Sequence, residues 1–177
     1  MSTSCASLRR SSAEPGSRRV TKQRAIGHIL PVAYWIKVTG TGEQPFTDDD
    51  WRPRRDRWAR EQGGGSFFPR RPSIRRGDRL VLYAAGSAAV FGAGRLFAIE
   101  EVISGEPEPS GHPRWKWRVY TRELCSVALL SRGPTLAEID VSARSLGRHS
   151  HIRLTDEQGR RAEELMRRYG EEAGGTR

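Results

Sequence analysis

The stretch of sequence that decides the fold is IRRGDRLVLYAAGSAAVFGAGRLFAIEEV, residues 74–102. Gly77-Asp78 is typical of a turn, and the apolar run 79–85 that follows it predicts a β-strand. Gly86-Ser87 indicates a hairpin connection, and residues 88–102 predict a second, longer strand. Two glycines inside that strand indicate a bulge or a close approach of another backbone; they are Gly92 and Gly94. The stretch therefore predicts a β-hairpin.

On the N-terminal side of this hairpin, the sequence predicts one strand and one helix. Residues 32–38 (VAYWIKV) alternate in the manner of a strand. The acidic segment 47–50 predicts a turn, and Pro53 fits the first position of a short helix that extends to about residue 62. An arginine-rich loop over residues 70–76 then leads back to the hairpin.

On the C-terminal side, residues 114–127 (RWKWRVYTRELCSV) predict another long strand and residues 148–154 a last short one. Two pairs of residues have the spacing of a capping box: Thr135 with Glu138, and Thr155 with Gln158. Apolar residues at helical spacing predict an amphipathic closing helix; they are Ala162, Leu165, Met166 and Tyr169. Because strands and helices do not alternate regularly, the prediction is an α+β fold with a curled or barrel-like sheet.

The chain carries an excess of positive charge. The 177 residues include 31 Lys and Arg against 21 Asp and Glu, which gives a formal net charge of +10. Residues 1–28 predict a disordered basic tail that adds nonspecific attraction to phosphates. Residues 29–170 predict a single domain, and residues 171–177 a flexible C-terminal tail. The arginine excess suits phosphate binding, although a GC-rich genome explains it equally. For the tail, a spacer, a misassigned start codon or a transit peptide are the alternatives.

The sequence excludes several classes of protein. No run of about 18 apolar residues occurs, so a transmembrane helix is not expected. Cys5 and Cys125 form no CxxC motif and predict free thiols, and we expect a cytoplasmic protein. No Walker loop, dinucleotide fingerprint, HExxH motif or GxSxG elbow is present. We therefore expect no catalysis, no cofactor and no bound metal; a metal site begun by His149 and His151 is the weaker alternative.

Taken in their order, the motifs resemble a known family. They are a Tyr34-Trp35-Ile36 strand, a Trp-containing helical insert, and the segments 74–83, 90–102, 114–124, 134–139 and 154–166. This order resembles the EVE domain of the PUA-like superfamily, which also contains YTH domains, over residues 32–169. A basic tail and a long, arginine-rich region over 40–71 depart from the family pattern.

The resemblance implies a PUA-like small β-barrel of about five to six strands with short peripheral helices. It implies a non-catalytic module that binds DNA or RNA and holds a modified or flipped base in an aromatic-lined pocket. Many family members accompany nuclease domains, so a separate nuclease or other effector protein is an expected partner. The alternative is a small-molecule or protein-binding β-domain with no nucleic acid role.

The resemblance also places the pocket, at the end of the first strand, in the loop after it and in the segment before the last strand. The residues expected to line it are Trp35, Lys37, Thr39, Trp51 (or Trp58 of the same helix), Tyr83, Ser87, Arg148, His149 and Ser150. The arginines expected to contact phosphates are Arg52, Arg54, Arg55, Arg70, Arg71, Arg75 and Arg76. Burial in the core is the competing interpretation for Trp35, Trp58 and Tyr83.

Overall fold

The computed structural model describes residues 31–172, except 42, 62–63, 87–93 and 148. The chain divides into two units, residues 1–30 and 31–177, and every described residue belongs to the second. The predicted basic tail and the predicted hairpin turn at Ser87 lie outside the described residues. Within the described part of the chain, no helix combines the length and the apolar character needed to cross a membrane.

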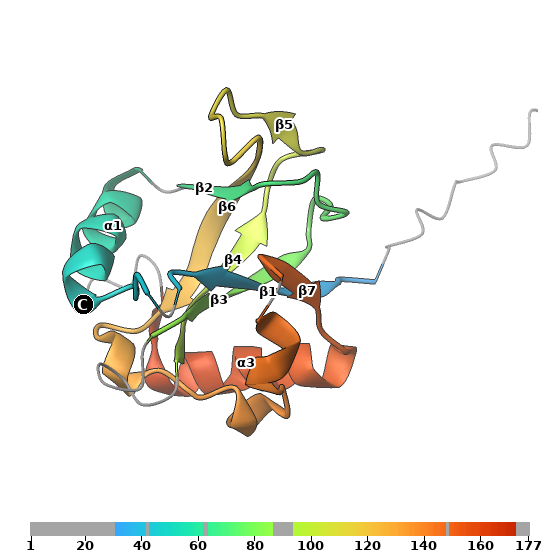
Figure 1. The fold of residues 1–177 in the computed structure, drawn as a ribbon. Coiled ribbons are helices and arrows are strands. Elements are labelled where there is room, and N and C mark those ends of the chain that lie inside the picture. Colours follow the sequence, from blue (N-terminus) through green and yellow to red (C-terminus); the bar gives the residue numbers. More distant parts are fainter. Residues whose placement is uncertain (1–30, 42, 62–63, 87–93, 148, 173–177) are drawn as a thin grey trace, which may run out of the picture. The chain divides into compact units, whose positions relative to one another are not determined.

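Six strands form the main path of one curled, half-barrel sheet in an α+β fold (Figure 1). Their order across the sheet is β2-β6-β4-β3-β1-β7. In chain order, they are β1 (Tyr34–Thr39), β2 (Gly64–Phe68), β3 (Arg79–Ala84), β4 (Arg95–Val102), β6 (Trp117–Ser126) and β7 (His151–Arg153). Two short strands, β5 (Glu108–Pro109) and β8 (Glu171–Glu172), also pair with β6. The β3–β4 pair is antiparallel, as the hairpin predicts, whereas β1 and β3 run parallel.

Among the described residues, two α-helices accompany the sheet, α1 (Asp48–Glu61) and α3 (Asp156–Tyr169). Short 3-10 turns occupy Leu130–Arg132, Ala137–Ile139 and Ala143–Leu146. The capping box of Thr155 and Gln158 is present at the start of α3, so this prediction is confirmed. Thr135 and Glu138 also make their reciprocal bonds, but the element that follows is only a 3-10 turn.

The start of α1 differs from the prediction. The acidic segment is the first turn of the helix, because Asp50 accepts from the backbone N–H of Thr47 at 2.9 Å and the Thr47 hydroxyl accepts from Asp50 N at 3.4 Å. Pro53 therefore lies inside α1 rather than at its first position. The helix tolerates it because Pro53 and Asp49 are exposed, so water can satisfy the carbonyl whose partner the proline lacks.

Strand β2 was not predicted, and it supplies one edge of the sheet. Its sequence, GGSFF, begins with two glycines and lacks a clear alternation of apolar and polar residues. The opposite edge is β7, and side chains bridge the two edges. The rings of Phe68 in β2 and His151 in β7 lie 5.0 Å apart, edge to face. The half-barrel is thus closed by side-chain packing at this point.

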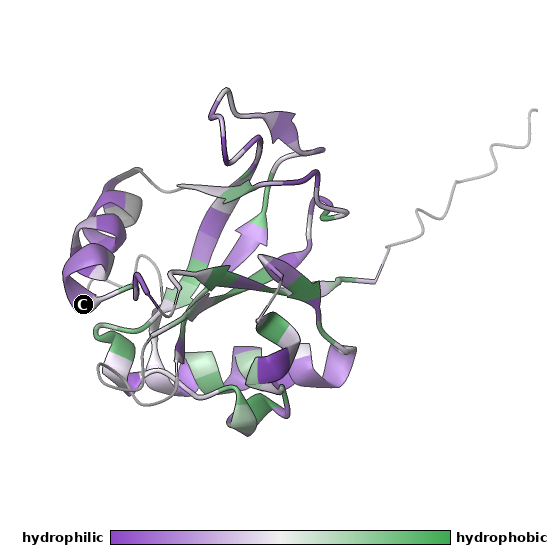
Figure 2. Cartoon of the chain, viewed as in Figure 1, coloured by the Kyte–Doolittle hydropathy of each residue, from purple (hydrophilic) through white to green (hydrophobic). Residues whose placement is uncertain are grey.

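The closing helix α3 covers one face of the sheet near β1 (Figure 1). Ala162 and Met166 are buried, as the apolar stripe predicts, while Tyr169 at the end of the stripe is 48% exposed. Gly159 sits directly on the ring of Tyr34: a Cβ built on Gly159 would lie 2.0 Å from Cγ of that ring. Helix α1, in contrast, is largely hydrophilic (Figure 2), and the buried Trp51 anchors it to the core.

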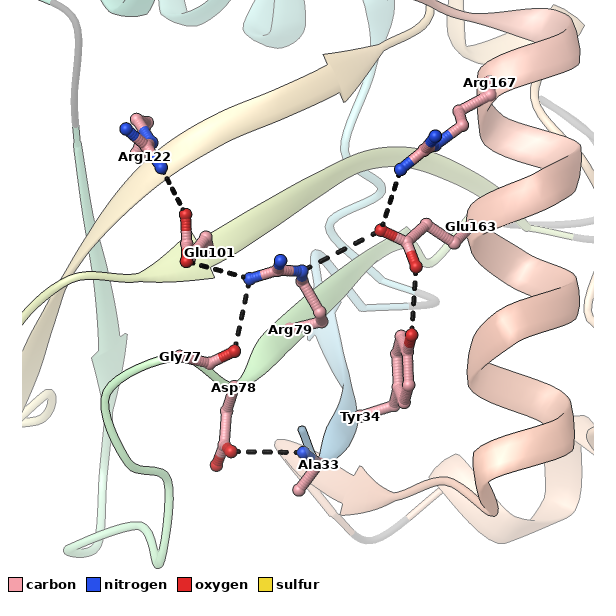
Figure 3. Close-up of polar contacts among 9 residues, drawn as sticks. All are labelled: Ala33, Tyr34, Gly77, Asp78, Arg79, Glu101, Arg122, Glu163 and Arg167. Carbon is pink, nitrogen blue, oxygen red and sulfur yellow. Dashed lines mark hydrogen bonds and ion pairs between the residues drawn. The ribbon is translucent and has the colours of Figure 1, made fainter. Parts of the chain in front are cut away.

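A polar network fixes α3 and the start of β1 to the sheet (Figure 3). Glu163 of α3 accepts from the Tyr34 hydroxyl at 2.9 Å and pairs with Arg79 at 3.8 Å. Arg79 also pairs with Glu101 of β4 at 3.1 Å. Asp78 of the Gly77-Asp78 turn accepts from Ala33 N at 3.2 Å, which aligns the beginning of β1 with β3.

Candidate functional site

A cleft lies where β1 and β3 end. Because these strands are parallel, their C-terminal residues Thr39 and Ala84 stand side by side. The chain then turns sharply at Gly40, which has a φ of +80°. A Cβ on Gly40 would lie 2.6 Å from the backbone nitrogen of Phe46, which itself donates to Ala85 O at 3.2 Å. Glycine is therefore required at this turn.

The cleft consists of two adjoining pockets of about 470 and 510 Å³, which share five lining residues. The shared residues are Val38, Gly40, Thr41, Arg114 and Trp115. The first pocket is completed by Lys37, Thr39, Gln44, Phe67 and His112. The second is completed by Tyr83, Ala85, Ala143, Leu146, Gly147, His149 and Ser150. Both volumes fall within the range of about 300–1,000 Å³ that is typical of small-ligand sites.

Three aromatic side chains line the cleft. Trp115 is half-buried and borders both pockets, with the guanidinium of Arg114 lying 5.1 Å from its ring centroid. Phe67, on the edge strand β2, is 38% exposed at the rim of the first pocket. Tyr83 closes the second pocket and is almost fully buried. Rings of this kind offer faces on which a planar ligand can stack.

The loop that carries Trp115 is held by its own hydrogen bonds. Nδ1 of His112 accepts from Arg114 N at 3.2 Å and from Trp115 N at 3.1 Å. The Ser110 hydroxyl donates to the Trp115 carbonyl, and Ser110 N donates to Lys116 O at 2.9 Å. These bonds fix the backbone on both sides of the indole ring, so Trp115 is positioned before any ligand arrives.

Lys37 is a buried cation in the wall of the first pocket, only 8% exposed. Its ammonium lies 5.7 Å from the ring centroid of Phe68. Burial, reinforced by the nearby Arg54, lowers the pKa of Lys37 to about 8, and the carboxylate of Glu100 opposes this shift. Glu100 is itself buried and accepts from the Ser66 hydroxyl at 3.1 Å. Burial raises the pKa of Glu100.

We expect Lys37 to titrate near pH 8. The chain contains three lysines, so ¹³C NMR of the lysine side chains should show three Cε signals, of which the one removed by Lys37→Met moves near pH 8. Because this pKa is below the ordinary 10.5, the folded protein holds fewer protons than the unfolded chain between these values. The free energy of unfolding should therefore rise with pH over that interval. A Lys37 signal that moves only above pH 10 would contradict the burial of this ammonium.

Other polar groups of the cleft come from β1 and from the segment before β7. The backbone N–H of Val38 donates to Ser150 O at 3.0 Å, which brings this segment to the cleft. The Ser150 hydroxyl lies 3.0 Å from Nδ1 of His151. Burial lowers the pKa of His151, and the nearby Lys37 and His149 lower it further. The Thr39 hydroxyl is buried and has no hydrogen-bond partner within the described part of the chain.

Five of the predicted pocket residues meet at this cleft: Lys37, Thr39, Tyr83, His149 and Ser150. Two others lie elsewhere. Trp35 donates from Nε1 to Asp78 at 3.1 Å and packs on His151, so its ring supports the sheet. Trp51 is fully buried, donates to Val127 O at 2.8 Å and packs on Phe97, so its placement as a stacking ring is corrected. Ser87, Arg148 and the side chain of Trp58 lie outside the described residues.

The predicted phosphate-contacting arginines do not line the cleft, as far as its described lining extends. Arg54 faces a separate cavity between α1 and β2. Arg71 pairs with Glu106 at 2.8 Å and lies over the Trp117 ring, and Arg55 lies 3.9 Å from Asp56. The remaining four are exposed on α1 or on the loop between β2 and β3: Arg52, Arg70, Arg75 and Arg76.

Among the lining residues that the sequence-based selection missed are Phe67, Arg114 and Trp115. The sequence places Trp115 inside the predicted strand 114–127, whereas β6 begins only at Trp117, so Trp115 lies in the loop before it. The adjacent Arg114 could have indicated that Trp115 lies at the surface, because a guanidinium next to an indole is typical of exposed aromatic sites. No group of three or more His, Cys, Asp or Glu that could hold a metal ion is found in the portion of the chain that is described.

No protein-family model matches the sequence, and no curated protein matches it. Among solved structures, the chain is similar to the NMR structure of Rpa0253 from Rhodopseudomonas palustris, target RpR3 of the Northeast structural genomics consortium. The two are 18% identical, with a TM-score of 0.47, and the similarity covers 76% of this chain and 93% of the other.

Proposed function

We propose that this protein is a PUA-like, EVE-type module that binds nucleic acid without catalysis and holds one modified or flipped base in the cleft. One observation carries the proposal: the cleft is lined by aromatic rings and by cations, and no carboxylate is among its described lining residues. Aromatic faces suit a base, and a cationic surround suits the phosphates beside it.

The position of the cleft also supports the proposal. It lies at the end of β1, beside the loop that follows and the segment before β7, which is where the resemblance to EVE domains implies a base pocket. In this arrangement, the base stacks on Trp115, while Lys37 and the Thr39 hydroxyl donate hydrogen bonds to acceptor atoms on its edge. A separate nuclease or other effector protein is the partner proposed for this module.

The proposal is tested by fluorescence anisotropy at two salt concentrations. The probes are plain DNA and RNA oligonucleotides and the same oligonucleotides carrying 5-methylcytosine, 5-hydroxymethylcytosine or N6-methyladenine. Affinity is expected to fall with salt while the preference for one modification persists, because phosphates supply attraction and base contacts supply selectivity. If all probes bind equally and binding disappears at high salt, the protein attracts nucleic acid only through its basic surface. That result would favour the small-molecule or protein-binding alternative.

Trp115→Ala should weaken binding of the preferred probe by about 1–3 kcal/mol, because a stacking ring is lost. Trp117→Ala is the matched control: Trp117 lies two residues further on, contacts Arg71 and does not line the cleft. Thermal unfolding of both variants verifies that each remains folded. If the two variants lose affinity equally, Trp115 is not the stacking residue.

A further inference from the structure

A second cavity adjoins the cleft. It lies between α1 and β2, has a volume of about 350 Å³ and is called here the α1–β2 cavity. Its lining residues are Lys37, Asp50, Pro53, Arg54, Arg57, Gly64, Gly65 and Phe67. Lys37 and Phe67 also line the first pocket of the cleft, so one buried ammonium and one exposed ring separate the two spaces.

The lining of the α1–β2 cavity is cationic. Three side chains carry positive charge, Lys37, Arg54 and Arg57, against one carboxylate, Asp50. That carboxylate is already engaged, because one of its oxygens accepts from the backbone N–H of Thr47 at 2.9 Å and from the Thr47 hydroxyl at 2.8 Å. Positively charged side chains therefore outnumber carboxylates by three to one in the described lining of the cavity.

The three cations also repel one another. Arg57 contributes to a lowered pKa of Arg54, and Arg54 contributes to the lowered pKa of Lys37, in each case added to the larger effect of burial. The carboxylates of Glu100 and Glu123 attract Arg54 and so offset part of this repulsion. Neither of them is among the described residues that line the cavity. An anion between the three cations would relieve the repulsion from the open side.

We propose that the α1–β2 cavity binds a phosphate group of the same nucleotide whose base occupies the cleft. This inference rests on the function proposed above and adds to it: Lys37, in the wall between the two spaces, contacts both parts of the nucleotide. Arg54 and Arg57 bind the phosphate oxygens, which suits the preference of guanidinium groups for phosphates. Gly64 and Gly65 line the same cavity and add no side chains to it.

The test compares nucleosides with nucleotides by isothermal titration calorimetry on the full chain. The probes are 5-methyldeoxycytidine, 5-hydroxymethyldeoxycytidine and N6-methyldeoxyadenosine, each as the nucleoside and as its 5′- and 3′-monophosphate. For at least one base, one monophosphate is expected to bind about tenfold more tightly than its nucleoside, because a charge-assisted bond to phosphate is gained. Inorganic phosphate at high concentration should remove this difference.

Arg57→Gln should abolish most of the tenfold gain and leave the affinity for the nucleoside unchanged. Arg60→Gln is the matched control, since Arg60 is exposed on the same helix and is not among the described residues lining the cavity. A nucleoside that binds as tightly as both of its monophosphates would overturn the phosphate site while leaving the base-binding proposal intact. Equal losses from the two variants would also overturn it. Failure of every nucleoside and every monophosphate to bind would overturn both proposals.

Discussion

Gly159→Ala is expected to lower the free energy of unfolding by about 3 kcal/mol or more. The new Cβ would lie 2.0 Å from Cγ and 2.5 Å from Cβ of Tyr34, atoms close to the backbone that cannot swing aside. Overpacking of a core typically costs about 1–3 kcal/mol, and here α3 must also move away from β1. The loss would be measured by urea denaturation followed by circular dichroism. It exceeds the gain of about 1 kcal/mol that alanine brings over glycine inside a helix.

A double-mutant cycle isolates the contact between Gly159 and Tyr34. In a Tyr34→Ala background, the collision is absent, so adding Gly159→Ala should be neutral or stabilising by up to about 1 kcal/mol. Tyr34→Phe is a further control, because it keeps the ring and removes only the hydroxyl that donates to Glu163. If Gly159→Ala destabilises the protein equally with and without the Tyr34 ring, close packing of α3 on β1 is not the cause.

Gly40→Ala is expected to disable the cleft and to destabilise the fold by about 2–4 kcal/mol. The positive φ of this residue disfavours any L side chain, and its Cβ would lie 2.6 Å from Phe46 N and 3.0 Å from Ala85 O. Relief requires the loop after β1 to move, and Gly40 and Thr41 in that loop line both pockets. Anisotropy with the preferred oligonucleotide should show at least a tenfold loss of affinity at a temperature where the variant is folded.

Gly147→Ala is the matched control for this prediction. Gly147 also lines the cleft, but it has a φ of −61°, and a Cβ there meets only Arg144 O at an ordinary 3.6 Å. Alanine at Gly147 should stabilise the fold by about 0.4–1 kcal/mol, because neither a strained φ nor a close contact opposes it. Retention of wild-type affinity by Gly40→Ala, once folded, would show that the loop after β1 does not shape the ligand site.

The sequence predicted best where the signal is local. The turn at Gly77-Asp78, the strand after it and the capping box of Thr155 and Gln158 depend on neighbours in the chain, and each is found as expected. Gly94 was expected to mark a bulge or a close approach of another backbone, and a Cβ there would lie 2.4 Å from the backbone oxygen of Ala84. The identity of that partner depends on the β3–β4 pairing, and the sequence alone did not reveal it.

The errors concern features that depend on distant parts of the chain. Trp51 is held away from the cleft by Phe97 and by the Val127 carbonyl, both far along the sequence. Strand β2 has a glycine-rich sequence with weak strand propensity and exists because β6 pairs with it. Trp115 reaches the cleft because His112 and Ser110 shape its loop, and hydrogen bonds of this kind leave no regular spacing in a sequence.

The place of β1 between β3 and the edge strand β7 has a consequence for synthesis of the protein. β1 pairs with β3 on one side and with β7 on the other, and β7 lies more than a hundred residues later in the chain. The wall of the cleft at His149 and Ser150 precedes β7 directly. A chain still being translated, with residues 149–153 inside the ribosome, therefore has an incomplete cleft. On the proposed function, a partly synthesised chain that lacks these residues should not bind the oligonucleotide that the finished domain binds.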